Sequence, residues 1–148
     1  MNEDITNTGS YEQRQRISKD NMSETLFENY CETKGIKIHH TGFDSVLNPV
    51  KNFWKVHPTI RALPDYLVEI EDNLAWCQVK GSNSLKLHDF VEYSTWDNLL
   101  SNECDFYVVF CFKDSKPIFR TMKDIANSIV GQEIRQWHDG VKYFRVPL

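Results

Sequence analysis

The sequence predicts an α/β protein in which helices flank a central mixed β-sheet. Three observations support this fold class: an amphipathic helix followed by a strand, a β-hairpin, and a later apolar run typical of a buried strand. The chain has 148 residues, 41% of them hydrophobic, which suffices for one domain with a packed core. We expect that domain over residues 21–148, after a polar arm, mobile or loosely helical, over residues 1–20.

The first expected elements are a helix over residues 22–34 and a strand over residues 36–40. Four apolar side chains recur at helical spacing in the first segment: Leu26, Phe27, Tyr30 and Cys31. Asn21 and Glu24 have the spacing of a capping box, and Gly35 is expected to end the helix. The next five residues, Ile-Lys-Ile-His-His, alternate between apolar and polar side chains, as a strand does.

A β-hairpin is expected next. Residues 66–70 and 74–79 are two apolar runs, and between them stands a cluster of turn-forming residues, Glu71, Asp72 and Asn73. Both faces of the second run are largely apolar. Such a strand belongs in the middle of a sheet that is covered on both sides.

The second half of the chain predicts further strands and helices. Residues 85–87 would extend a strand, residues 89–100 form a helix, and residues 105–112 are a continuous apolar run that predicts a buried strand. Residues 117–120 predict another strand. Thr121 and Asp124 are expected to cap a helix that ends before Gly131. A closing hairpin over residues 134–138 and 141–146 would turn at the Asp-Gly pair of residues 139 and 140.

Three polar side chains should meet at one end of the first hairpin. If the chain folds about residues 71–73, Asp65 lies opposite the segment from Gln78 to Lys80. Side chains two apart on a strand share a face, so Gln78 and Lys80 point the same way. Asp65 can join them from the neighbouring strand.

A carboxylate, an amide oxygen and an ammonium group gathered in this way suit a hard cation beside a lysine that handles protons or stabilises charge. These are the ingredients of metal-assisted phosphodiester hydrolysis. The alternative is a surface ion pair at a hairpin end, worth about 0–1 kcal/mol.

The sequence Pro64-Asp65, a gap, and Gln78-Val79-Lys80 resembles the signature of the PD-(D/E)XK nucleases, with glutamine in place of the second acidic residue. Some members, including a branch of homing endonucleases, also have glutamine there. The resemblance covers residues 22–120 in element order. It implies a restriction-endonuclease-like fold and an Mg²⁺-dependent DNA endonuclease of a homing-endonuclease or resolvase-like branch, with Mn²⁺ as a substitute. Products would carry 5′-phosphate and 3′-hydroxyl ends.

The resemblance also implies roles for individual residues. Asp65, the Gln78 side chain and the Val79 carbonyl would hold the metal ion, and Lys80 would orient or help to deprotonate the attacking water. In this family the first helix often supplies a glutamate to the metal site. Glu24 is the expected residue here, acting directly or through water, and Glu28, one turn later on the same face, is the alternative.

The DNA-binding residues are expected in a basic segment over residues 34–61. The chain has a net charge of −4, but this segment has five Lys or Arg against one Asp. Lys51 and Lys55, in a proline-containing and aromatic loop, are the main candidates for phosphate contacts. Lys37, His40 and Arg61 are further candidates from the same segment.

The remaining expectations concern the cysteines, the partners and the location of the protein. The four cysteines lack metal-binding spacing and are expected to pack as small apolar side chains. No apolar stretch is long enough to cross a bilayer, so we expect a soluble, intracellular (cytoplasmic) protein that forms a homodimer or higher homo-oligomer on DNA. Two other functions stay open: a catalytically inactive nucleic-acid-binding module of the same fold, and a protein-interaction domain.

Overall fold

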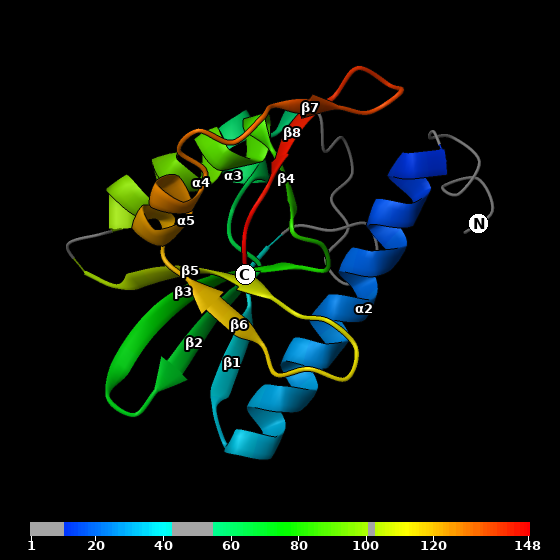
Figure 1. Cartoon of the computed structure of the whole chain (residues 1–148). Helices are drawn as coiled ribbons and strands as arrows, with labels where there is room; N and C mark the ends of the chain where they lie inside the picture. The colour runs from blue at the N-terminus through cyan, green and yellow to red at the C-terminus, as the bar shows by residue number, and fades with distance from the viewer. Residues whose placement is uncertain (1–10, 43–54, 101–102) are drawn as a thin grey trace.

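The computed structural model (Figure 1) describes residues 11–42, 55–100 and 103–148, with the backbone alone for residues 11–21. It is an α/β structure with helices on both sides of a mixed sheet, as predicted. The five-stranded sheet has the order β1-β2-β3-β5-β6. Its strands are β1 (Lys37–His40), β2 (Tyr66–Ile70), β3 (Asn73–Lys80), β5 (Asp105–Phe110) and β6 (Ile118–Arg120).

The sheet is mixed because one of its four pairings is parallel. β1, β2 and β3 pair in antiparallel fashion, and so do β5 and β6. β3 and β5 are parallel, and the chain passes between them through helix α4 (Leu87–Leu100). β3 therefore lies in the middle of the sheet, as its two apolar faces predicted.

The register of the first hairpin is the predicted one. Tyr66 pairs with Cys77, and the two strands turn at residues 71 and 72. Glu71 has a φ of 56°, a left-handed conformation that tight turns often require. This register places Asp65, directly before β2, opposite Gln78.

Helix α2 (Tyr11–Lys34) is longer than expected. It begins at Tyr11, so the predicted start at Asn21 was wrong and that residue does not cap the helix. The division of the chain at residue 20 stays a prediction, although α2 runs through it. The predicted end is confirmed: Gly35 has a φ of +69°, and the Ile36 amide donates to the Cys31 carbonyl at 2.8 Å. Together with the Gly35–Glu32 hydrogen bond, this is a Schellman cap.

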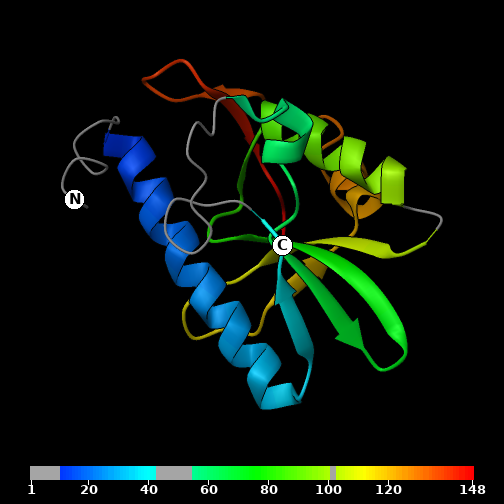
Figure 2. The same cartoon turned by 180° about the vertical axis from the view of Figure 1, so that it is seen from behind.

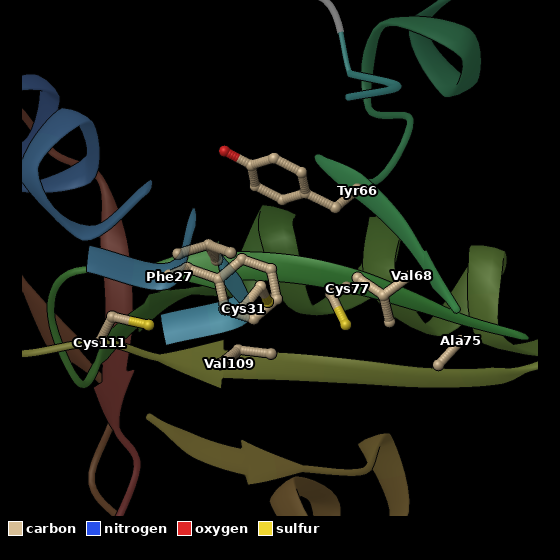
Figure 3. Close-up of a cluster of buried hydrophobic side chains, with 9 residues drawn as sticks. Phe27, Cys31, Tyr66, Val68, Ala75, Cys77, Val109 and Cys111 are labelled. Carbon is tan, nitrogen blue, oxygen red and sulfur yellow. The ribbon is translucent and has the colours of Figure 1, made fainter. Parts of the chain in front are cut away.

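One hydrophobic core lies between α2 and the sheet (Figure 3). Phe27 of α2 is fully buried, and its ring centroid lies 5.3 Å from that of Tyr66. Cys31, Cys77 and Cys111 lie in the same core, and all four cysteines are free, as the sequence predicted. Burial raises the pKa of Cys31 to about 11 and that of Cys111 to about 12, and raises the pKa of Cys77 as well.

A second core covers the other face of the sheet, beneath α4 and α5 (Met122–Ser128). Its buried side chains are Leu85, Tyr93, Phe106, Val108, Phe110, Met122, Ile125, Phe144 and Val146. The capping box at the start of α5 is the predicted one. Thr121 accepts from the Asp124 amide and Asp124 accepts from the Thr121 amide. The helix was expected to continue up to Gly131, but α5 ends at Ser128.

The last strands form a separate three-stranded sheet, in the order β4-β8-β7. β7 (Arg135–Gln136) and β8 (Lys142–Arg145) are the predicted closing hairpin, with Gly140 at a φ of +86°. The strand predicted at residues 85–87 is β4 (Ser84–Lys86), but it pairs with β8 instead of extending the main sheet. Figures 1 and 2 show this small sheet standing beside α4 at the end of the molecule opposite the β2–β3 turn.

A short helix, α3 (Pro58–Arg61), follows the segment of residues 43–54, which lies outside the described residues. The indole of Trp96 on α4 donates to the Thr59 carbonyl at 3.1 Å and fixes α3 against α4. Within the described part of the chain, no helix has the length and apolar character needed to cross a membrane.

Candidate functional site

The structure brings together three of the residues that the sequence selected. One carboxylate oxygen of Asp65, Oδ2, accepts hydrogen bonds from the Gln78 amide nitrogen and from the Val79 backbone N–H, each at 2.9 Å. Both bonds are partly buried, which strengthens them relative to bonds in open water. The side chain of Asp65 thus joins the end of β2 to the end of β3.

The backbone explains why this contact forms. The β2–β3 ladder stops at the pair of Tyr66 and Cys77, so the Val79 N–H lies beyond the last backbone partner. The Asp65 carboxylate takes the place of that missing carbonyl. Lys80 directs its carbonyl to the β5 side, where it accepts from the amide of Cys111, the residue directly after β5, at 2.9 Å. Because adjacent residues of a strand direct their backbone groups to opposite neighbours, the Val79 carbonyl lies on the Asp65 side.

Residues after β1 enclose the other side of Asp65. The amides of Thr41 and Gly42 donate to the Asp65 carbonyl at 2.9 and 3.3 Å, and the Thr41 hydroxyl donates to the Pro64 carbonyl at 2.8 Å. A Cβ at Gly42 would lie 3.2 Å from Asp65 Cα and 3.3 Å from Asp65 Oδ1. A side chain at this position would therefore press on Asp65, which would have to shift by a few tenths of an ångström.

Lys80 lies two residues beyond Gln78 on β3 and on the same face of the sheet. Its side chain is only 11% exposed, and its ammonium nitrogen is 3.8 Å from Oδ2 of Asp89, in the first turn of α4. A nearly buried lysine needs a compensating charge. Asp89 provides it and holds the ammonium group near the end of β3.

Glu24 and Glu28 approach from α2, on the other face of the sheet. The Tyr66 hydroxyl donates to Glu28 Oε1 at 2.9 Å. Burial, this hydrogen bond and the charges of Glu24, Glu28 and Asp65 all raise the pKa of Tyr66. Glu28 is therefore fixed by Tyr66, and Glu24 and Asp65 both lie within electrostatic range of its hydroxyl group.

The donors at this site fit a hard cation in kind. Asp65 supplies a carboxylate, Gln78 an amide oxygen and Val79 a carbonyl, and Mg²⁺ prefers oxygen ligands. Across the described residues, however, no three His, Cys, Asp or Glu side chains form a group that could hold a metal ion. An ion would therefore need the neutral oxygens of Gln78 and Val79 in addition to the carboxylate.

The expected DNA-binding residues are dispersed. Lys51 lies outside the described residues, and Lys55 is exposed at the start of the next described segment. Lys37, on the edge strand β1, lies 3.8 Å from Glu69, and the His40 ring packs edge-on against Tyr66 with centroids 5.0 Å apart. Arg61 is the last residue of α3.

Sequence reasoning missed Asp89 and Gly42. An acidic residue in the first turn of the helix that follows the lysine strand was a usable signal for Asp89, because such residues favour helix N-termini. For Gly42, the signal was a glycine two residues after a predicted strand, because glycine allows close approach of two backbones.

Comparisons with known proteins identify no family. No protein-family model matches the chain, and no curated protein matches it. Among solved structures it is similar to Hjc, a Holliday junction resolvase from Archaeoglobus fulgidus, with a TM-score of 0.47 and 10% identity over 82% of this chain and 85% of that one. It is also similar to D212, a nuclease from a fusselovirus, with a TM-score of 0.44 and 9% identity over 93% and 84%. At these values the likeness assigns no function.

Proposed function

We propose that this chain is a metal-dependent DNA endonuclease that hydrolyses phosphodiester bonds and leaves 5′-phosphate and 3′-hydroxyl ends. The observation that carries the proposal is the contact of Asp65 with both Gln78 and Val79, next to a nearly buried lysine on the same strand face. Those residues stand in the order of the PD-(D/E)XK signature that the sequence resembles.

Each residue has a role in this proposal. Asp65, Gln78 and the Val79 carbonyl would hold Mg²⁺, or Mn²⁺ in its place. The positive charge of the bound ion would offset negative charge on the scissile phosphate and would activate water. Gln78 would have to turn its amide, because its nitrogen faces Asp65 in the structure. Glu24 would assist directly or through water, and Glu28 is the alternative.

Lys80 would orient the attacking water and offset negative charge that develops on the phosphate. Stabilisation of this type is worth about 3–4 kcal/mol where a single donor has been removed from comparable sites. The ion pair with Asp89 holds the ammonium group in place before substrate binds, so little reorganisation is needed.

The test is nicking of supercoiled plasmid DNA by the purified chain with Mg²⁺, with Mn²⁺ and with EDTA. We expect nicking with either metal and none with EDTA. Asp65→Asn is the informative variant, because the amide oxygen of asparagine can still accept from the Val79 N–H while the charge is lost. Lys80→Met keeps the length of the side chain and removes its charge.

Both variants should lower the nicking rate at least about 100-fold, the effect expected when one transition-state contact is lost. A matched control is Lys113→Met, an exposed lysine in the turn between β5 and β6, which should leave the nicking rate unchanged. Thermal unfolding should show that all three variants are folded. Equal nicking by the Asp65→Asn variant and the unsubstituted chain would refute the proposal.

One observation favours a catalytically inactive nucleic-acid-binding module instead. Asp65, Gln78 and Val79 satisfy one another by hydrogen bonds, and Lys80 pairs with Asp89. A chain with this function would bind DNA and leave plasmid intact under both metals. If Asp65 and Lys80 serve only the fold of a protein-interaction domain, their variants would lose stability and leave DNA affinity unchanged.

The proposal includes a homodimer or higher homo-oligomer, because cutting both strands of a duplex needs two active sites in small nucleases of this kind. Sedimentation equilibrium of the chain with and without DNA tests it. A monomer that nicks single strands only would refute the oligomer and leave the hydrolytic function standing.

A further inference from the structure

Three cations lie on one face of the small β4-β8-β7 sheet. Lys86 and Arg135 both pair with Tyr143, from opposite sides, and Arg145 pairs with Ser84. Directly paired residues share a face, and so do residues two apart on a strand. Lys86, Arg135 and Arg145 therefore project from the same face as Tyr143, and we call these three residues the basic face.

The basic face points away from the core. The opposite face of the small sheet carries Leu85 and Phe144, which are 0% and 6% exposed and belong to the core beneath α4. Arg135 and Arg145 are exposed, and Lys86 is half-buried. Arg135 and Arg145 are thus accessible to a partner at the surface, while Tyr143 on the same face is 8% exposed and stacked against Trp137.

An aromatic stack braces this sheet. The rings of Trp137 and Tyr143 are nearly parallel, with an angle of 12° and centroids 4.1 Å apart. Trp137 also donates its backbone N–H to the Val141 carbonyl at 3.1 Å. Both contacts hold the β7–β8 hairpin together, so the positions of Arg135 and Arg145 are set before any partner binds.

The strands that carry the basic face, β4, β7 and β8, contain no acidic residue to balance it, although the whole chain has a net charge of −4. None of the three cations forms an ion pair with a described residue. Like charges gathered on one face of a sheet lower its stability. An external polyanion explains their arrangement better than folding does.

The basic face is connected directly to the candidate site. β4 follows the lysine end of β3 after three residues, and one of these, Asn83, holds β8 by two hydrogen bonds. Its carbonyl accepts from the Val146 amide at 2.8 Å, and its side-chain amide donates to the Val146 carbonyl at 3.2 Å. In Figure 1 the small sheet rises from the end of β3. A nucleic-acid strand on the basic face can continue toward Gln78 and Lys80.

We propose that the basic face binds the phosphodiester backbone of DNA and guides it to the candidate site. This inference rests on the proposed function for the identity of the polyanion, and it assigns the DNA contact to three residues that are not among the DNA-binding residues expected above. The contacts are to phosphates, so they position the DNA and carry no base specificity.

The test measures binding of a fluorescent DNA duplex by anisotropy in EDTA, where hydrolysis is absent, between 50 and 200 mM NaCl. Three phosphate contacts contribute about −2.7 to the slope of log affinity against log salt, or about 40-fold over this range. We expect the variant Lys86→Gln/Arg135→Gln/Arg145→Gln to lose this share of the slope and to bind at least tenfold more weakly at 50 mM NaCl.

Two controls separate the basic face from net charge and from folding. The variant Lys86→Arg/Arg135→Lys/Arg145→Lys keeps all three charges and should bind as the unsubstituted chain does. A second variant makes the same change in net charge at exposed lysines elsewhere, Lys113→Gln/Lys116→Gln/Lys123→Gln, and should keep the slope. Arg135→Gln alone should reduce the slope by about 1, which provides a test even if the triple variant does not fold.

Unchanged affinity and slope in the Lys86, Arg135 and Arg145 glutamine variant would overturn the inference. So would an equal loss in the Lys113, Lys116 and Lys123 variant. A different result would refute the proposed function: the unsubstituted chain binds DNA with the expected slope but does not nick plasmid. Nicking at an unchanged rate by the folded triple variant, with unchanged binding, would refute the basic face alone.

Discussion

Gln78→Glu is the most informative single substitution at the candidate site. It replaces a neutral amide that donates to Asp65 Oδ2 at 2.9 Å with a carboxylate of the same shape. Without metal, two carboxylates would then face each other in a partly buried position. With a divalent ion between them, the second carboxylate becomes a ligand. The substitution therefore makes stability depend on metal in a way that the native glutamine does not.

The expected magnitude follows from the geometry. A hydrogen bond to a charged group contributes about 1.5–3 kcal/mol, and repulsion between two charges about 4 Å apart is at most about 4 kcal/mol near a protein surface. Protonation of one carboxylate relieves part of the repulsion, so we expect a net loss of about 2–4 kcal/mol in EDTA. For a chain of this size that loss lowers Tm by about 4–16 °C.

The assay is thermal unfolding in EDTA and at increasing Mg²⁺ concentration. An ion present at 100 times its dissociation constant restores about 2.7 kcal/mol, so Mg²⁺ should recover most of the loss in the variant. Gln132→Glu, an exposed glutamine after α5, is the matched control and should change Tm little under either condition. A variant that is destabilised in EDTA and gains nothing from Mg²⁺ would show that the contact is structural, and an unchanged Tm in EDTA would refute the contact itself.

Three further predictions concern the surroundings of the site. Asp89→Asn removes the negative charge that lies 3.8 Å from the Lys80 ammonium group and should cost about 1–3 kcal/mol in urea unfolding, between the values for exposed and buried pairs. An unchanged midpoint would contradict the pairing. Tyr66→Phe removes the donor to Glu28 and should cost about 1–2 kcal/mol, and a double-mutant cycle with Glu28→Gln should show coupling between the two. His39 holds the pKa of Glu69 below its ordinary value. The pair therefore stabilises the fold at pH values above the ordinary pKa of a glutamate, and this stabilisation is lost as the pH falls through the lowered pKa of Glu69. In the His39→Asn variant, NMR titration should show a higher Glu69 pKa, and an unchanged value would refute the contact.

Much of the site could be predicted because its geometry is local. The turn at residues 71–73 and the alternation of side chains along the hairpin are enough to place Asp65 opposite the segment from Gln78 to Lys80. The same alternation assigns Gln78 and Lys80 to one face. The Asp65–Gln78 contact in the structure confirms this register.

Other features depend on contacts between distant parts of the chain, which local patterns do not encode. The partner of Lys80 is known only once α4 is placed across the end of β3. The pairing of β4 with β8, and hence the basic face, joins segments that are far apart in sequence. The start of α2 was missed because residues 11–21 are polar and lack the apolar spacing that marks a packed helix.

Three thiols lie between α2 and the sheet, so their chemical modification can report separation of the helix from the sheet. Cys31 belongs to the helix, whereas Cys77 and Cys111 belong to the sheet side of the same interface, and each is at most 3% exposed. Cys111 lines a surface pocket beside α2, but an alkylating reagent can reach Cys31 and Cys77 only after the helix detaches. The rate of their modification, compared with that of the half-exposed Cys104, therefore reports how often this layer separates from the rest, with no added label.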